Sequence, residues 1–144
     1  MALKVELKPG ERIILGECVI TNDNQRTRLF IEGDAPILRE KDILTLATAD
    51  TPAKRIYLAV QIMYLERDIS KTRDEYLALV QDFVRAAPSS LPLVDTINNA
   101  ILTNALYKAL REAKALIEFE TGLFNHAKRR AGVREHSSED GEPS

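Results

Sequence analysis

Cysteine and histidine are scarce in this sequence of 144 residues, which contains one cysteine and two histidines. A single cysteine excludes a disulfide bond within the chain and a cysteine-rich zinc site. His126 and His136 have neither a cysteine nor a paired carboxylate at the spacing of metal ligands. The Gly-x-Ser-x-Gly motif and a phosphate-binding glycine loop are also missing, since Gly10 and Gly16 are turn residues between short strands. We therefore expect a protein that is not an enzyme and that has no catalytic residues, metal or cofactor.

An excess of positive charge is missing as well. Lysine and arginine total 20 against 22 aspartate and glutamate residues, which gives a net charge of -2. Residues 1–44 carry seven basic and eight acidic residues, and Phe30 is their only aromatic residue. A basic domain is the usual mark of nucleic-acid binding, so any RNA site here must be a local cluster. Base stacking of the type used by RRM domains is not indicated.

Long apolar segments are also missing from the sequence. No run of residues is long and apolar enough to span a bilayer, and residues 1–4 lack the apolar region of a signal peptide. We therefore expect a cytoplasmic protein with no membrane partner. Hydrophobic residues make up 44% of the chain, which is sufficient for a core, and the length suits one domain or two small ones.

The first 43 residues are short apolar segments divided by turn residues. Residues 3–7 alternate between apolar and polar side chains, as a half-buried strand does. Pro9-Gly10 predicts a turn after them. Cys18 lies in another expected strand, where we expect it to be buried. The expected strands are residues 3–7, 12–15, 18–21, 27–32 and a short fifth strand at 37–39.

The rest of the chain has the apolar spacing of helices. Asp50 or Thr51 is the expected cap of the first helix, with Pro52 in its first turn, and Ser70 is the expected cap of the second. Residues 56–65 are apolar nearly all round, which predicts burial in a bundle or in a subunit interface. The expected helices are residues 51–67, 71–87, 92–102 and from 103 or 104 to about 128.

Strands followed by helices indicate an α+β fold with segregated parts. We expect a small N-terminal antiparallel β module at residues 1–44, a C-terminal helical bundle at 51–128, and a disordered tail at 129–144 that has almost nothing to bury. Five short strands leave unpaired edges and a thin core, and the apolar segment at 56–65 needs covering. We therefore expect a homo-oligomer.

Short motifs in the first third of the chain resemble the CsrA family of RNA-binding translational regulators. The matching residues are Gly10-Glu11, Leu15-Gly16-Glu17, Arg28-Leu29, Ala35-Pro36, and Arg39-Glu40 with Ile43. The same stretch, continued through residues 51–61, resembles the FlbT family more closely, over roughly residues 2–127. The FlbT family comprises post-transcriptional repressors of flagellin synthesis. This resemblance implies a protein that associates with the 5′ untranslated region of flagellin mRNA, lowers its translation and promotes its degradation during flagellum biogenesis.

Seven basic residues of the β module are candidate RNA contacts. Six of them are assigned to the site, Lys4, Lys8, Arg12, Arg28, Arg39 and Lys41, and the seventh candidate is Arg26. Taken alone, each is an ordinary exposed basic residue. The CsrA resemblance implies that the first and last strands pair in a dimer to form an edge that grips an RNA loop. Residues 4–8 and 38–42 would supply that edge, with Arg39 at the position of the key arginine of the family.

Arg39 has a second interpretation, as a structural ion pair with Glu6 or Glu17. The chain also departs from the CsrA pattern at Leu7-Lys8, where the family has a basic pair. The edge strands could therefore bind a protein instead of RNA.

A different class of function is a protein-interaction module or chaperone-like adaptor. It would bind flagellin, a flagellar regulatory protein or another flagellar assembly factor through an apolar stripe of the last helix. The candidate partner-binding residues are Leu116, Phe119 and Leu123. Salt dependence separates the two functions, because direct RNA binding weakens steeply as salt rises.

Overall fold

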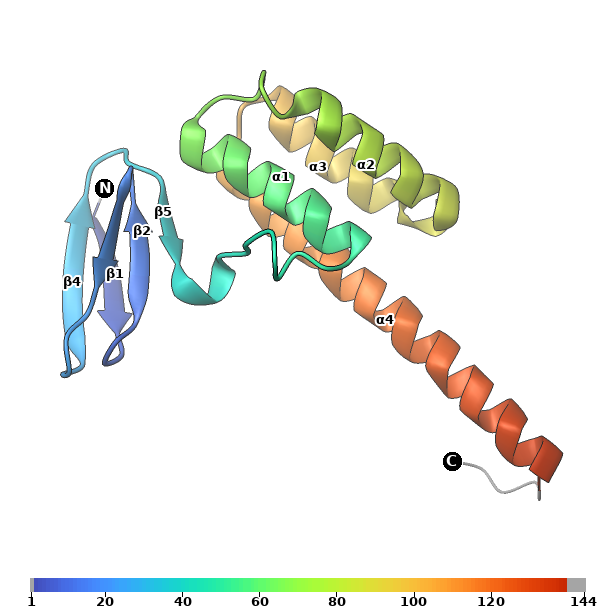
Figure 1. The fold of residues 1–144 in the computed structure, drawn as a ribbon. Helices are drawn as coiled ribbons and strands as arrows, with labels where there is room; N and C mark the ends of the chain where they lie inside the picture. The colour runs from blue at the N-terminus through green and yellow to red at the C-terminus, as the bar shows by residue number, and fades with distance from the viewer. Residues whose placement is uncertain (1, 140–144) are drawn as a thin grey trace.

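The structure, a computed structural model, describes residues 2–139, with side chains for residues 2–131 (Figure 1). Five strands in two small antiparallel sheets are followed by four α-helices. The predicted α+β fold is confirmed. The strands are β1 (Ala2–Leu7), β2 (Arg12–Leu15), β3 (Cys18–Thr21), β4 (Thr27–Glu32) and β5 (Ile37–Arg39).

The two sheets divide the strands unequally. β1 pairs with β4, from Ala2 opposite Glu32 to Leu7 opposite Thr27. β2 lies between β3 and β5 in the second sheet, so β1 and β5 belong to different sheets. The tight turn after β1 depends on Gly10, whose φ of +74° is left-handed backbone that favours glycine.

The three-stranded sheet forms the middle layer of the molecule. Ile13 packs with Val5 and Leu7 of β1 in a small core between the sheets. The neighbouring residue Ile14 and the strand-paired Leu38 pack instead with the helical core. Adjacent residues of a strand point to opposite faces, so this sheet connects the β1–β4 sheet to the helices (Figure 1).

Cys18 is exposed, so its predicted burial is wrong. It belongs to β3, the edge strand of its sheet, and three of the four β3 residues are exposed. Neighbouring Val19 is 62% exposed. The sequence shows an apolar strand, but exposure depends on which strand lies at the sheet edge.

Four α-helices form the second part of the chain. They are α1 (Pro52–Glu66), α2 (Arg73–Ala86), α3 (Leu91–Leu102) and α4 (Leu106–Glu139). Thr51 caps α1 as expected, because its side chain accepts a hydrogen bond from the Lys54 backbone N–H at 3.2 Å. Ser70 does not cap α2. Its hydroxyl donates to Asp68 Oδ1 at 2.7 Å, and α2 begins three residues later.

The apolar segment at residues 56–65 is covered within the chain. Ile56, Val60 and Met63 have no exposed surface, and α1 packs against both α2 and α4. Of the two environments predicted for this segment, the helical bundle is therefore correct. One of the two reasons to expect an oligomer is removed by this packing.

α4 extends farther than its sequence pattern predicts. We expected the helix to end near Lys128 and disorder to follow, whereas α4 continues to Glu139. Its side chains at residues 121–131 are all exposed, and this end of the helix projects beyond the bundle (Figure 1). The part of the expected tail at residues 140–144 lies outside the described residues. The division of the chain into a β module, a helical module and a tail stays a prediction.

Candidate nucleic-acid interface

Three side chains on one face of α1 hold the segment that carries Arg39 and Lys41. Tyr57 Oη donates to the Asp42 carbonyl at 2.6 Å. Four residues on, the Gln61 side chain bonds both backbone groups of Leu44, at 2.9 and 3.0 Å. Spacings of three and four place residues on one helix face, and residue 64 completes this row.

Tyr64 binds β5 directly. Its hydroxyl accepts from the Ile37 N–H at 2.9 Å and donates to the Ile37 carbonyl at 3.0 Å. Burial raises the pKa of the Tyr57 and Tyr64 hydroxyls above the ordinary tyrosine value. Both hydroxyls are neutral near pH 7 and can donate their hydrogen bonds to main-chain oxygens. These bonds fix β5 and the turn after it on α1.

Arg39 joins β5 to β1. Its Nη2 atom donates to the main-chain carbonyl of Glu6 at 3.0 Å. The Nε atom is buried and has no hydrogen-bond partner among the described residues. The ion pair that we considered with Glu6 or Glu17 is therefore replaced by a bond to a main-chain oxygen.

The carboxylate of Glu6 has a different partner. Arg26 Nη1 donates to Glu6 Oε1 at 3.0 Å. This hydrogen bond and the charge of Arg26 lower the pKa of the Glu6 carboxyl. Arg39 and Arg26 thus approach the same residue, one at its main chain and one at its side chain.

A hollow of about 620 Å³ lies beside Arg39, between β1, β5 and the turn after β1. Its basic residues are Lys8, Arg26, Arg39 and Lys41, and its acidic residues are Glu6, Glu11 and Glu40. Basic residues are in excess here although the chain has a net charge of -2. We name this feature the Arg39 hollow.

The structure gathers only part of the predicted RNA-binding set in the Arg39 hollow. Lys8, Arg39 and Lys41 line it, whereas Arg12 pairs with Glu40 at its border, with Nε 3.2 Å from Oε1. Lys4 lies on β1 opposite Phe30 of β4. Arg28 lies two residues from Phe30 on the same strand, and thus on the same face.

Arg26, a candidate that was not assigned to the RNA site, also lines the Arg39 hollow, and it comes from the loop before β4. Phe30 of the neighbouring β1–β4 sheet was not a candidate. Phe30 is 68% exposed, and cross-strand pairing places it beside Lys4. Sequence shows the aromatic residue and the basic residues, but only strand register shows that they are neighbours.

The three apolar residues predicted to bind a protein partner differ in their exposure to solvent. Leu116 is fully buried, so its assignment to an exposed stripe is wrong. Phe119 is half-buried against the helical core, and Leu123 is 40% exposed. Phe124 is 56% exposed and was not predicted as part of this stripe. The helices that cover α4 at Leu116 do not extend to residues 123 and 124.

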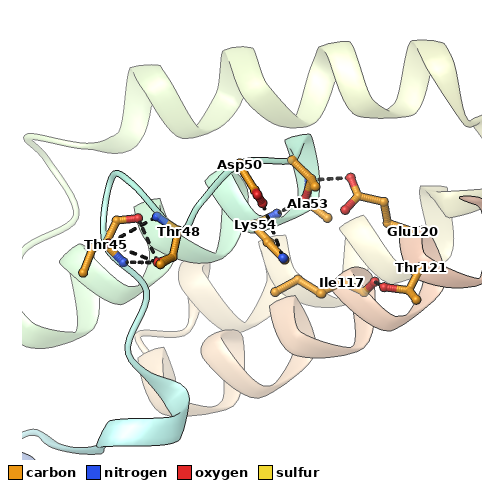
Figure 2. A network of polar contacts seen from close by, with 9 residues as sticks. Thr45, Thr48, Asp50, Ala53, Lys54, Ile117, Glu120 and Thr121 are labelled. Atoms are coloured by element: carbon orange, nitrogen blue, oxygen red, sulfur yellow. Dashed lines mark hydrogen bonds and ion pairs between the residues drawn. The ribbon is translucent and has the colours of Figure 1, made fainter.

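Glu120 marks the place where this cover ends. It is buried, and its Oε2 atom accepts a hydrogen bond from the Ala53 N–H at 2.9 Å (Figure 2). The carboxylate thus meets one of the unpaired N–H groups of the first turn of α1, where negative charge is favourable. The sequence pattern predicts an ordinary solvated acidic residue here, and only the packing of α1 on α4 shows its role.

The described residues contain no group of three His, Cys, Asp or Glu side chains arranged to hold a metal ion. Among the helices of the described chain, none combines the length and the apolar character that crossing a membrane requires.

The fold and this surface define an α+β protein with a polar hollow among its N-terminal strands. A family model described as "Flagellar protein FlbT" matches residues 3–124. The chain belongs to the FlbT family.

Several curated relatives cover most of this chain. A protein of Bradyrhizobium diazoefficiens, "Probable flagellum biosynthesis repressor protein FlbT 1", is 57% identical over 124 residues, which is 85% of each chain. A Rhodopseudomonas palustris protein with a similar name is 54% identical over 87% of this chain and 99% of its own. "Flagellum biosynthesis repressor protein FlbT" of Caulobacter vibrioides is 34% identical over 88% of this chain and 92% of its own. No solved structure matches, so the likeness of the β module to the CsrA family stays a prediction.

Proposed function

We propose that this protein represses flagellin synthesis after transcription. It associates with the 5′ untranslated leader of flagellin mRNA, lowers translation and promotes degradation of the message. Membership of the FlbT family and the names of the relatives, flagellum biosynthesis repressors, support a repressor role in flagellar synthesis. The leader RNA as its target rests on the surface of the β module.

The observation that carries this proposal is the Arg39 hollow. Arg39 is anchored through one terminal nitrogen, which orients its guanidinium group beside Lys8 and Lys41. A guanidinium group presents its donors in a fixed fork that matches phosphate oxygens and base edges. The Nε atom is buried, so the terminal nitrogens are the donors that Arg39 presents to a ligand. The four basic residues of the hollow against three acidic ones give a small local excess of positive charge in a chain with a net charge of -2, which supports the proposal.

Repression by binding alone is consistent with a protein that is not an enzyme. Occupation of the leader excludes ribosomes, and a message without ribosomes is open to a separate ribonuclease. The proposed activity needs no metal, cofactor or membrane, and it places the protein in the cytoplasm with the mRNA.

The test is a titration of the purified protein with labelled flagellin leader RNA, measured by fluorescence anisotropy at several salt concentrations. We expect saturable binding that weakens steeply as salt rises, because phosphate contacts release counterions. A leader of reversed sequence is the control for specificity. No binding at low salt would refute the proposal.

A second function, binding of flagellin or another flagellar assembly factor, is favoured by the projecting end of α4. Leu123 and Phe124 are exposed there with no helix of the described bundle over them. A parallel titration with flagellin separates the two functions. Binding of flagellin that resists salt and is lost in Phe124→Ser, with no binding of leader RNA, would support this second function in place of the first.

A further inference from the structure

A groove runs along the seam between the turn after β5 and α4. Two adjoining hollows of about 320 and 200 Å³ form it, and they share Lys41, Tyr57 and Lys114 in their walls. Lys41 also lines the Arg39 hollow. The groove therefore continues the Arg39 hollow from the β module onto the helical module.

Positive charge predominates in this groove. Its walls contain four basic residues, Lys41, Lys54, Arg111 and Lys114, and two acidic residues, Asp42 and Glu118. Lys114 pairs with Asp42 at 3.0 Å, and Lys54 pairs with Asp50 at 3.4 Å. Lys41 and Arg111 make no ion pair within the described part of the chain. Their charges are available to a ligand.

An aromatic ring marks the far end of the groove. Tyr107 is 53% exposed, and its ring centroid lies 5.6 Å from that of Tyr64. Tyr107 also lines a third hollow, of about 530 Å³, whose charged residues are the basic Arg67 and Lys108 and the acidic Asp34. An exposed ring that is supported from one side, in hollows where basic side chains outnumber acidic ones, is an arrangement on which an unpaired base stacks.

We infer that this groove is a second contact surface for single-stranded RNA, reaching from Lys41 along α4 to Tyr107. The inference rests on the proposed function and extends it, because none of the predicted RNA contacts belongs to the helical module. From Glu118 to Tyr107 the helix rises about 16 Å, which equals about five nucleotides at the 3.4 Å spacing of a stacked strand. Phosphates lie against Lys41 and Arg111, and a base stacks on Tyr107.

The experiment compares four variants in titrations with the flagellin leader RNA. Arg111→Glu reverses a charge in the groove, and Tyr107→Ala removes the ring. Tyr107→Phe keeps the ring and controls for the loss of the hydroxyl. Arg85→Glu is the matched charge control, because Arg85 is an exposed arginine on α2. Thermal unfolding of each variant confirms that it is folded.

We expect Arg111→Glu to weaken leader binding about tenfold or more and to reduce the salt slope by about one. Tyr107→Ala should weaken binding between about fivefold and 150-fold, the range found when an aromatic stacking partner is removed. Tyr107→Phe and Arg85→Glu should bind within about twofold of the original chain.

The outcomes separate the inference from the proposed function. If the original chain binds no leader RNA, the proposed function fails and the inference fails with it. If the original chain binds, Arg39→Ala weakens binding, and both groove variants bind normally, the inference alone is overturned. If the groove variants keep leader binding but lose flagellin in a parallel titration, the groove is a protein surface and the inference is again overturned.

Discussion

Arg39 Nη2 lies 3.0 Å from the main-chain oxygen of Glu6 and joins β5 to β1, two strands that belong to different sheets. The same guanidinium group lines the hollow beside Lys8 and Lys41. Arg39 therefore has a structural role and a proposed binding role, and the two can be measured separately.

Replacing Arg39 should affect both roles. Arg39→Ala removes a hydrogen bond and should lower the free energy of unfolding by about 0.5–1.5 kcal/mol. Affinity for leader RNA per folded molecule should fall by about 1–3 kcal/mol if the side chain reads a base. Thermal unfolding and anisotropy titration measure the two quantities. Arg39→Lys keeps the positive charge but lacks the forked guanidinium donors. It should therefore retain only part of the RNA affinity that Arg39→Ala loses. Unchanged affinity in Arg39→Ala would remove the hollow as the RNA site.

Replacing Glu120 should affect stability alone. Glu120→Ala leaves the Ala53 N–H buried without its acceptor, which should cost about 1–3 kcal/mol. Glu120→Gln keeps an oxygen acceptor and should cost less. Glu118→Ala, on an exposed residue of the same helix, is the matched control and should change stability by less than about 0.5 kcal/mol. Chemical denaturation measures these changes, and equal stability of Glu120→Ala and Glu118→Ala would contradict the capping role.

Tyr57 should make the protein sensitive to alkaline pH. Burial raises its pKa in the folded state above the ordinary value of about 10 that it has when unfolded. Its contribution to stability is complete below pH 10 and is lost as pH rises from there toward the folded pKa, by up to about 1.4 kcal/mol per pH unit.

Tyr57→Phe isolates this effect. The variant loses the hydrogen bond to the Asp42 carbonyl, worth about 1 kcal/mol at neutral pH, but it should lose less additional stability between pH 8 and pH 11. Chemical denaturation across that range compares the two chains. Parallel stability curves would show that Tyr57 does not titrate as its burial requires.

Self-association stays a prediction. The helix expected to need cover is buried within the chain, but β3 remains an edge strand with Val19 exposed. Unpaired edges favour pairing with another chain. We expect light scattering at micromolar concentration to show a homodimer or a higher even oligomer. A single species of 16.2 kDa would contradict this expectation.

The end of α4 should be dispensable for folding. Residues 129–131 are exposed, so the described side chains of this end bury nothing. Removing residues 129–144 should leave the melting temperature essentially unchanged. Removing residues 120–144 also deletes Glu120, which caps α1, and should clearly lower the melting temperature. A marked loss of thermal stability in the shorter truncation would show that this end docks elsewhere.

Local sequence signals predicted the elements of this fold well. Pro9-Gly10 marked the first turn, and Gly10 has the left-handed backbone that such a turn needs. Thr51 and Pro52 marked the start of α1, where the structure begins it. These signals act within a few residues, so a single sequence contains them completely.

The errors concern contacts between distant segments. Exposure of Cys18 depends on strand order, and burial of Leu116 depends on how far the covering helices extend along α4. The Arg39 bond ends on a main-chain oxygen of Glu6, which no side-chain pattern encodes. Only half of the six predicted RNA contacts line the Arg39 hollow. The sequence could not predict which ones, because residue spacing does not show which turns lie close together.

Repression through the leader is the central claim, and cell-free translation tests it most directly. Purified protein is added to a reporter message carrying the flagellin leader and to the same reporter with an unrelated leader. We expect reduced translation of the first message only, and recovery of translation when Arg39→Ala replaces the original chain. Equal translation of both messages, with or without the protein, would contradict the account.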